Sequence, residues 1–128
     1  MQENHLFEYA VIRIVPRVER EEFLNVGVIL YCQKLKFLHT RYKLDRDRIR
    51  AFGEAVDCKE LEEQLQAFER ISQGTSGSGP IGQLDLASRF RWLTANRSTI
   101  LQTSRVHPGF CEDPKETLEK LFDQLVIV

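Results

Sequence analysis

The chain has 128 residues, of which 42% are hydrophobic and 29% charged, and its 18 basic and 19 acidic side chains leave a formal net charge of -1. This composition is typical of a globular domain and excludes disordered, collagen-like and coiled-coil proteins. A chain of this length buries about two-thirds of its unfolded surface when it folds, so we expect one domain over residues 1–128.

The sequence shows no sign of a membrane anchor or a secretory signal. The longest apolar stretch, residues 26–32, is too short to cross a bilayer. The N-terminal residues lack the basic start and the apolar run of a signal peptide, so we expect a cytoplasmic protein. Cys32, Cys58 and Cys111 are widely spaced and form no Cys-x-x-Cys pair. We therefore expect reduced thiols, without a disulfide framework or a metal site.

Apolar and β-branched residues predict three strands in the first third of the chain. Residues 6–15 are largely apolar at both alternating sets of positions, which is typical of a central strand covered on both faces. A charged turn separates this strand from a second at 23–32, and a third follows at 35–43. Asn25 and Gly27 in the second strand indicate a bulge or a close approach of two backbones. We expect the three strands to form an antiparallel meander.

Helices are predicted in the rest of the chain, where the apolar period changes from two to about 3.6 residues. Asp45, Asp57 and Asp113 each precede such a segment and supply the carboxylate that a helix N-terminus needs. Residues 86–94 suit either a short helix or a strand, and we favour the helix. A further strand is predicted at 98–103.

Residues 74–80 contain only small residues and turn formers, so we expect a flexible surface loop within the single domain. Gly77, Gly79 and Gly82 match the glycine spacing of dinucleotide-binding loops, but a predicted helix precedes them and Pro80 removes an amide that would bind phosphate. We therefore expect no cofactor. Because strands come first and helices follow, the sequence predicts an α+β fold, with helices packed on an antiparallel sheet of three to four strands.

Basic side chains are concentrated in residues 74–111, which contain four arginines and one acid. The arginines are Arg89, Arg91, Arg97 and Arg105, and His107 is nearby. Guanidinium groups bind phosphate and carboxylate through paired hydrogen bonds, so this cluster predicts a site for an acidic partner or a phosphate-bearing ligand. The alternative is that acids of the predicted helices neutralise these arginines within the fold.

The aromatic residues in this stretch allow a second hypothesis. Phe90 and Trp92 alternate with Arg89 and Arg91, as in sites where single-stranded nucleic acid stacks on aromatic rings. Core packing explains the two aromatic residues at least as well. The near-neutral total charge also lacks the basic excess of a duplex-binding domain.

A third hypothesis is a small enzyme that acts on an anionic substrate. Arg13 interrupts an otherwise apolar strand, which is explained either by pairing with Glu8 or Glu22 or by contact with a ligand. In an enzyme, Arg13, Arg97 and His107 would converge in one pocket. No known catalytic motif occurs in the sequence, so we predict no catalytic residue and favour a function without chemistry.

The ordered segments 9–16, 22–28, 89–94 and 97–99, with the closing helix that begins at Asp113, resemble a known family. It is a bacterial family catalogued as a domain of unknown function, number three thousand and thirty-seven. The resemblance implies no activity, but such proteins tend to be encoded beside HipA-like kinase-fold proteins, which implies a kinase of that type as a partner.

The sequence and the resemblance together predict a bacterial accessory or interaction module that binds an acidic or phosphate-bearing partner. The predicted binding residues are Arg89, Arg91, Trp92, Arg97, Arg105, His107 and Arg13.

Overall fold

A computed structural model describes residues 3–52, 56–95 and 99–127, so Arg97 and the first residue of the strand predicted at 98–103 lie outside the described residues. The centre of the fold is a five-stranded sheet. Its strands are β1 (His5–Ile14), β2 (Leu24–Cys32), β3 (Phe37–Tyr42), β4 (Leu101–Thr103) and β5 (His107–Cys111). All pairings are antiparallel, and the order is β3-β2-β1-β4, with β5 also paired to β1. The predicted α+β fold is confirmed, with one strand more than expected.

Within the described residues, five helices and one 3₁₀ helix connect and follow the strands. They are η1 (Val18–Arg20), α1 (Arg46–Phe52), α2 (Cys58–Gln73), α3 (Gly79–Gly82), α4 (Leu86–Leu93) and α5 (Pro114–Leu125). The predicted caps are confirmed: the Asp57 carboxylate accepts hydrogen bonds from the amides at the start of α2, and the Asp113 carboxylate does the same for α5. The Asp45 carboxylate likewise accepts from two amides of α1.

The segment that suited a helix or a strand is the helix α4. Asp85 caps it, because its carboxylate accepts a 2.9 Å hydrogen bond from the Ser88 amide. Phe90 and Leu93 are spaced three residues apart, so both fall on the buried side of the helix. A strand would place Phe90 and Trp92 on one face, whereas in the helix only Phe90 is buried.

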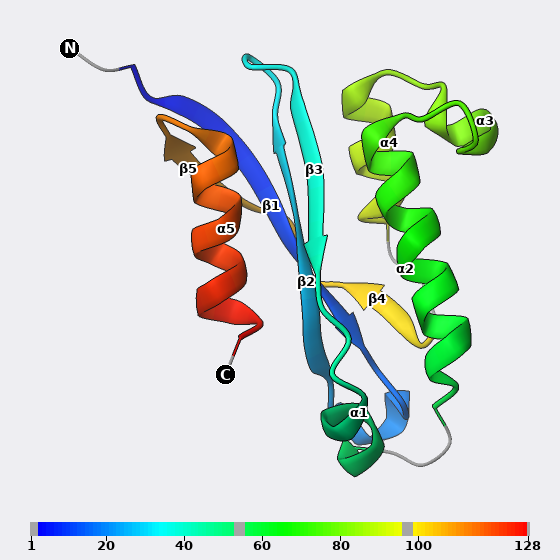
Figure 1. The fold of residues 1–128 in the computed structure, drawn as a ribbon. Helices are drawn as coiled ribbons and strands as arrows, with labels where there is room; N and C mark the ends of the chain where they lie inside the picture. The colour runs from blue at the N-terminus through cyan, green and yellow to red at the C-terminus, as the bar shows by residue number, and fades with distance from the viewer. Residues whose placement is uncertain (1–2, 53–55, 96–98, 128) are drawn as a thin grey trace.

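Helices cover both faces of the sheet (Figure 1). On one face, Ile12 and Ile29 pack in one core cluster with Leu65 of α2 and Phe90 of α4. On the other face, Leu30 packs in a second cluster with residues of α5 that include Phe122. Because successive residues of a strand point to opposite faces, the even-numbered residues of β1 point to the α2–α4 side and the odd-numbered ones to the α5 side.

The bulge expected in the second strand is present. The register between β1 and β2 shifts between Ile12, which pairs with Gly27, and Arg13, which pairs with Asn25, so that Val26 is the extra residue. Gly27 is also a point of close approach, because a Cβ atom there would lie 2.8 Å from the Arg41 carbonyl oxygen. A side chain at this position would therefore collide with the neighbouring strand β3.

β4 and β5 pair with one edge of β1, and β5 was not predicted. β4 lies along the C-terminal end of β1 and β5 along its N-terminal end. β5 contains Pro108 and Gly109, two residue types that are depleted in strands. Gly109 is required by packing, since a Cβ atom there would lie 2.6 Å from the Phe7 ring.

The segment predicted as a flexible loop, residues 74–80, is partly helical. Gly74 ends α2 in the left-handed conformation with φ of 67°, which is common at this position because glycine has no side chain to clash. The short helix α3 begins at Gly79, and Pro80 lies in its first turn. Flexibility of the turns before α3 stays a prediction.

Candidate functional site

The fold divides the arginine-rich stretch between different environments. Arg89 and Arg91 belong to α4, whereas Arg105 lies between β4 and β5 and His107 begins β5. Arg97 is outside the described residues. The residues of this stretch that the structure describes therefore come from a helix, a connection between strands and a strand.

Arg89 is a structural residue of the helical layer. It is only 8% exposed, and its Nη1 atom donates 3.2 Å hydrogen bonds to the carbonyl oxygens of Ile71 and Ser72. These carbonyls belong to the last turn of α2, where helix carbonyls lack partners within the helix. The positive guanidinium also lies at the negative end of the helix dipole. Arg89 thus joins α4 to α2 and presents little surface to a ligand.

Arg91 is exposed and weakly held. Its side chain is 67% exposed, and its Nη1 atom lies 3.8 Å from a carboxylate oxygen of Glu8 in β1. An exposed ion pair of this length contributes about 0–1 kcal/mol, so it does not fix the guanidinium. Of the predicted arginines in α4, Arg91 is therefore the one that a partner can reach.

Trp92 points away from Arg91. It is 41% exposed and lines a cavity of about 240 Å³ together with Phe68 and Ile71 of α2. Arg91, in contrast, reaches Glu8 on β1. The alternation of aromatic and basic residues in the sequence therefore does not produce one stacking platform on α4.

Arg13 and His107 do not converge. The Arg13 guanidinium lies 4.3 Å from the centre of the Phe23 ring, while the His107 ring lies 5.3 Å from the Tyr9 ring. Tyr9 and Arg13 are four residues apart on β1, which corresponds to about 13 Å along a strand. Neither acid that the sequence offered as a partner forms an ion pair with Arg13. Glu8 lies beside Arg91 instead, and Glu22 lies beside Arg20.

Arg105 is exposed at the junction of β4 and β5. The registers of these two strands on β1 differ by one residue. Ser104 is bonded to Val11 through its amide and its hydroxyl, which makes Arg105 the extra residue of an edge bulge. Among the residues that the structure describes, no carboxylate lies within ion-pair distance of Arg105.

An exposed apolar pair lies beside Arg91. Leu6 of β1 and Phe110 of β5 are directly opposite each other in the sheet, and they are 53% and 72% exposed. Glu8 and its neighbour Pro108 form the next pair on the same face. We call the five residues Leu6, Glu8, Arg91, Pro108 and Phe110 the β1–β5 surface.

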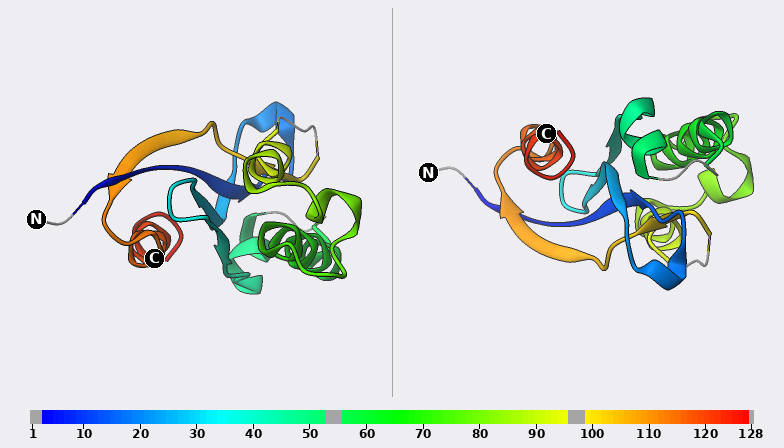
Figure 2. Two further views of the ribbon diagram at one scale, coloured as in Figure 1. Left: turned by 90° about the horizontal axis from the view of Figure 1, so that it is seen from above. Right: turned by 90° about the horizontal axis from the view of Figure 1, so that it is seen from below.

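The position of this surface in the fold explains its exposure. Figure 2 shows the N-terminal half of β1 and the neighbouring β5 extending away from α2, α3 and α4. The even-numbered residues of β1 point to the side of those helices, but at this end of the strand the helices do not cover them. The sheet thus presents two uncovered apolar side chains beside one cation.

The two charged residues of this surface also affect the pKa of Tyr31, a buried residue of β2. Burial raises the pKa of Tyr31, the β2 residue opposite Glu8, and the Glu8 carboxylate raises this pKa further. The Arg91 guanidinium has the opposite effect on the same pKa. The Tyr31 ring also lies 5.2 Å from the ring of Phe90 in α4. Glu8 and Arg91 are therefore the residues of the β1–β5 surface that lie near this part of the core.

Sequence reasoning missed Leu6 and Phe110. Leu6 belongs to a strand whose two alternating sets are largely apolar, and the charge of Glu8 on the same face is the one sign in the strand that this end is uncovered. Phe110 belongs to the strand that was not predicted. The two residues before it, Pro108 and Gly109, could have indicated an edge strand, because such residues occur at sheet edges.

The fold and this surface define the chain as a small α+β domain with an antiparallel sheet that is partly uncovered at one end. The chain belongs to the family described as Protein of unknown function (DUF3037), which matches residues 9–126. Comparison with curated proteins and with solved structures gave no match. Among the described residues, no helix has the length and apolar character needed to cross a membrane.

Proposed function

We propose that this protein is an interaction module that binds an acidic partner protein through the β1–β5 surface. The observation that carries the proposal is the exposed pair of Leu6 and Phe110 at the uncovered end of the sheet, with the exposed cation Arg91 beside Glu8 of the adjoining pair. Large exposed apolar side chains that lie together, rather than singly, are typical of protein interaction sites.

The apolar pair supplies the larger share of the expected binding energy. Burying an exposed phenylalanine or leucine side chain contributes about 1.5–3 kcal/mol. The Arg91 side chain is exposed, the Glu8 side chain is half-buried, and the two are 3.8 Å apart, so releasing this long ion pair for a new partner costs about 1 kcal/mol. A partner carboxylate or phosphate can therefore replace Glu8 while apolar side chains cover Leu6 and Phe110.

Arg91 gives the interaction its charge preference. Residues 74–111 carry four arginines and one acid, and Arg105 is exposed on the neighbouring strand edge without an ion pair among the described residues. A cation at the rim of an apolar patch selects acidic partners and increases the rate of association. A HipA-like kinase-fold protein, which the family resemblance implies, is the candidate partner to test first.

Affinity capture with surface variants tests the proposal. Tagged wild-type protein is compared with Phe110→Ser and Arg91→Glu, and the eluates are analysed for proteins and for nucleic acid. We expect an acidic protein in the wild-type eluate and a loss of about tenfold or more in both variants, because Phe110→Ser removes an apolar contact and Arg91→Glu turns an attractive charge into a repulsive one. Val18→Ser and Arg17→Glu are matched controls, since both residues are exposed outside this surface, and they should leave the recovery unchanged.

Two results would contradict the proposal. One is an eluate whose composition is the same for wild type, Phe110→Ser and Arg91→Glu. The other is recovery of nucleic acid in place of an acidic protein, which would favour the nucleic-acid hypothesis.

A further inference from the structure

A second, separate feature is a cavity of about 530 Å³ between α1 and the start of α2. It lies at the end of the molecule opposite to β5 (Figure 1), so it is independent of the β1–β5 surface. Its volume falls within the range of about 300–1,000 Å³ that small-molecule sites occupy. Its lining residues are Arg46, Ile49, Arg50, Val56, Asp57, Cys58 and Lys59.

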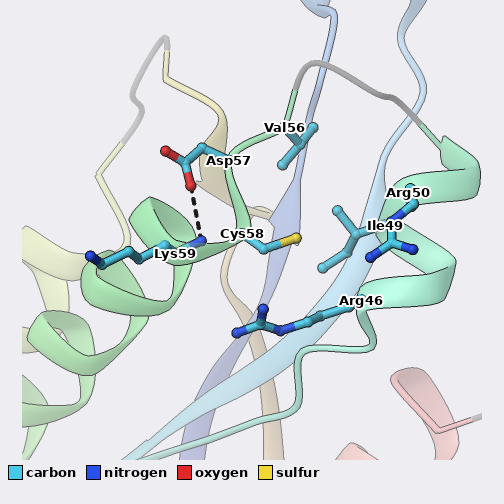
Figure 3. Close-up of a pocket in the computed structure, with 7 residues that line it drawn as sticks. All are labelled: Arg46, Ile49, Arg50, Val56, Asp57, Cys58 and Lys59. Atoms are coloured by element: carbon cyan, nitrogen blue, oxygen red, sulfur yellow. Dashed lines mark hydrogen bonds between the residues drawn. The ribbon is translucent and has the colours of Figure 1, made fainter.

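The floor of the cavity is apolar. Ile49 is 1% exposed, and Val56 and Cys58 are half-buried. Figure 3 shows the Cys58 sulfur pointing from the start of α2 toward Ile49 and the side of the cavity formed by α1. This floor suits the apolar or aromatic part of a small molecule.

The charged groups around this floor are mainly cationic. Three of the lining side chains are basic and one is acidic. The acid, Asp57, is engaged as the cap of α2, since its carboxylate accepts hydrogen bonds from the amides of Lys59 and Glu60. Asp57 therefore occupies these amides at the N-terminus of α2, so an anion in the cavity would be bound by the basic side chains.

Two arginines stand one helical turn apart on this side of α1. Like charges at positions i and i+4 destabilise a helix by a few tenths of a kcal/mol, although Arg50 in the last turn of α1 also interacts favourably with the helix dipole. Arg46 has an exposed partner, Glu62, at 3.4 Å. Within the described part of the chain, Arg50 has no carboxylate at ion-pair distance.

We propose that this cavity binds a small organic phosphate monoester. The guanidinium groups of Arg46 and Arg50 would bind the phosphate through charge-assisted hydrogen bonds, which phosphate oxygens accept in pairs from arginine. The organic group of the ligand would lie on Ile49, Val56 and Cys58. Lys59 adds positive charge at the rim, although its side chain runs away from α1 (Figure 3).

The reactivity of the Cys58 thiol reports directly whether the cavity holds a ligand. Cys32 and Cys111 are 0% and 5% exposed, whereas Cys58 is half-buried in the wall of the cavity. A ligand on the floor should therefore slow alkylation of Cys58 by N-ethylmaleimide. Mass spectrometry of the Cys58 peptide follows the reaction, and Cys58→Ser identifies any signal that comes from the two buried thiols.

The probe is phenyl phosphate, compared with inorganic phosphate and with neutral benzyl alcohol. We expect phenyl phosphate to slow alkylation of Cys58 at the lowest concentration, inorganic phosphate to require more, and benzyl alcohol to have no effect at equal concentration. Arg50→Gln and Arg46→Gln should each raise the concentration of phenyl phosphate needed by about tenfold. Arg105→Gln is the matched control, because it removes an exposed arginine elsewhere, and it should bind the probe like wild type.

The proposal is overturned if phenyl phosphate leaves the alkylation rate of wild-type Cys58 unchanged at millimolar concentration. It is also overturned if benzyl alcohol protects Cys58 as well as phenyl phosphate does, or if Arg105→Gln weakens protection as much as Arg50→Gln. None of these results affects the β1–β5 surface, because no residue is shared between the two sites.

Discussion

Arg89 and Arg91 stand two residues apart in α4, yet the fold gives them different surroundings. Two residues correspond to a rotation of about 200° around a helix, so their side chains leave α4 in nearly opposite directions. Arg89 is buried against the last turn of α2, whereas Arg91 reaches an acid on β1 from the exposed side. One arginine is therefore a structural residue and the other is a candidate for binding.

Substitution of these two arginines should separate the two roles. Arg89→Met keeps an apolar stem but removes the donors for the carbonyls of Ile71 and Ser72, so we expect it to lower the free energy of unfolding by about 1.5–3 kcal/mol. The matched variant Arg91→Met should change this free energy by less than about 0.5 kcal/mol. Urea unfolding followed by circular dichroism measures both values, and equal losses would show that the assignment is wrong.

His39 should make stability depend on pH. The residue is exposed as a whole, but burial of part of its ring lowers its pKa below the ordinary 6.5, and the Lys115 ammonium lowers this pKa further. Glu69 has the opposite effect. The unfolded chain therefore takes up a proton at higher pH than the folded one, so the contribution is fully present above about pH 6.5 and is lost as the pH falls through the folded pKa.

We expect the free energy of unfolding to fall as the pH drops below about 6.5, the ordinary pKa of histidine, and His39→Gln to reduce this fall. Lys115→Gln should reduce it in part, because the lysine is the second cause of the shift. Urea unfolding at a series of pH values measures the slope. If the free energy of unfolding of His39→Gln depends on pH as steeply as that of wild type, the pH dependence comes from other groups.

Gly27, beside the bulge in β2, is the residue that lets β2 and β3 approach closely. Gly27 pairs with Ile12 on one side and with Tyr42 on the other, and a Cβ atom there would also lie 2.9 Å from the Cβ of Tyr42. Gly27→Ala should therefore lower the free energy of unfolding by about 1–3 kcal/mol through overpacking. Gly77→Ala is the control, since no atom lies within 4 Å of the position of its Cβ. Thermal unfolding compares the two, and a Gly27→Ala protein as stable as wild type would argue against the close approach.

Elements that depend on local signals were predicted well. The strand at 6–15 and the helices capped by Asp57 and Asp113 carry their periodicity and their capping residues within the sequence itself, and the structure confirms them. β5 could not be predicted, because its sequence is poor in strand-forming residues and it is a strand only through pairing with distant β1. For the same reason the sequence could not show that Phe110 lies beside Leu6.

The candidate site was predicted only in part. The arginine-rich stretch is a real feature of the sequence, but adjacency along the chain does not determine which side of a helix or sheet each guanidinium occupies. Arg91 remains in the proposed surface, while Arg89 is used within the fold as the intramolecular alternative allowed, although by carbonyl oxygens rather than by carboxylates. Apart from their spacing of four residues, nothing in the sequence indicates that Arg46 and Arg50 line a cavity.

At the scale of the whole molecule, the three layers leave one end of the sheet without a helix on the α4 side (Figure 2). The core itself is covered from both sides, since α2 and α4 pack on one face and α5 on the other. The exposed Leu6 and Phe110 are thus not needed to close the core. This separation allows variants of the β1–β5 surface to change binding while the fold stays intact.

The central proposal is tested most directly by the dissociation constant of the complex with the captured acidic partner protein. Calorimetry measures this constant at low and at higher salt. An apolar surface with a cationic rim predicts binding that weakens severalfold between about 50 mM and about 300 mM salt, because salt screens the contacts of Arg91. Phe110→Ser should weaken binding by about tenfold or more at both concentrations. A dissociation constant that changes neither with salt nor with Phe110→Ser would show that the partner binds elsewhere on the molecule.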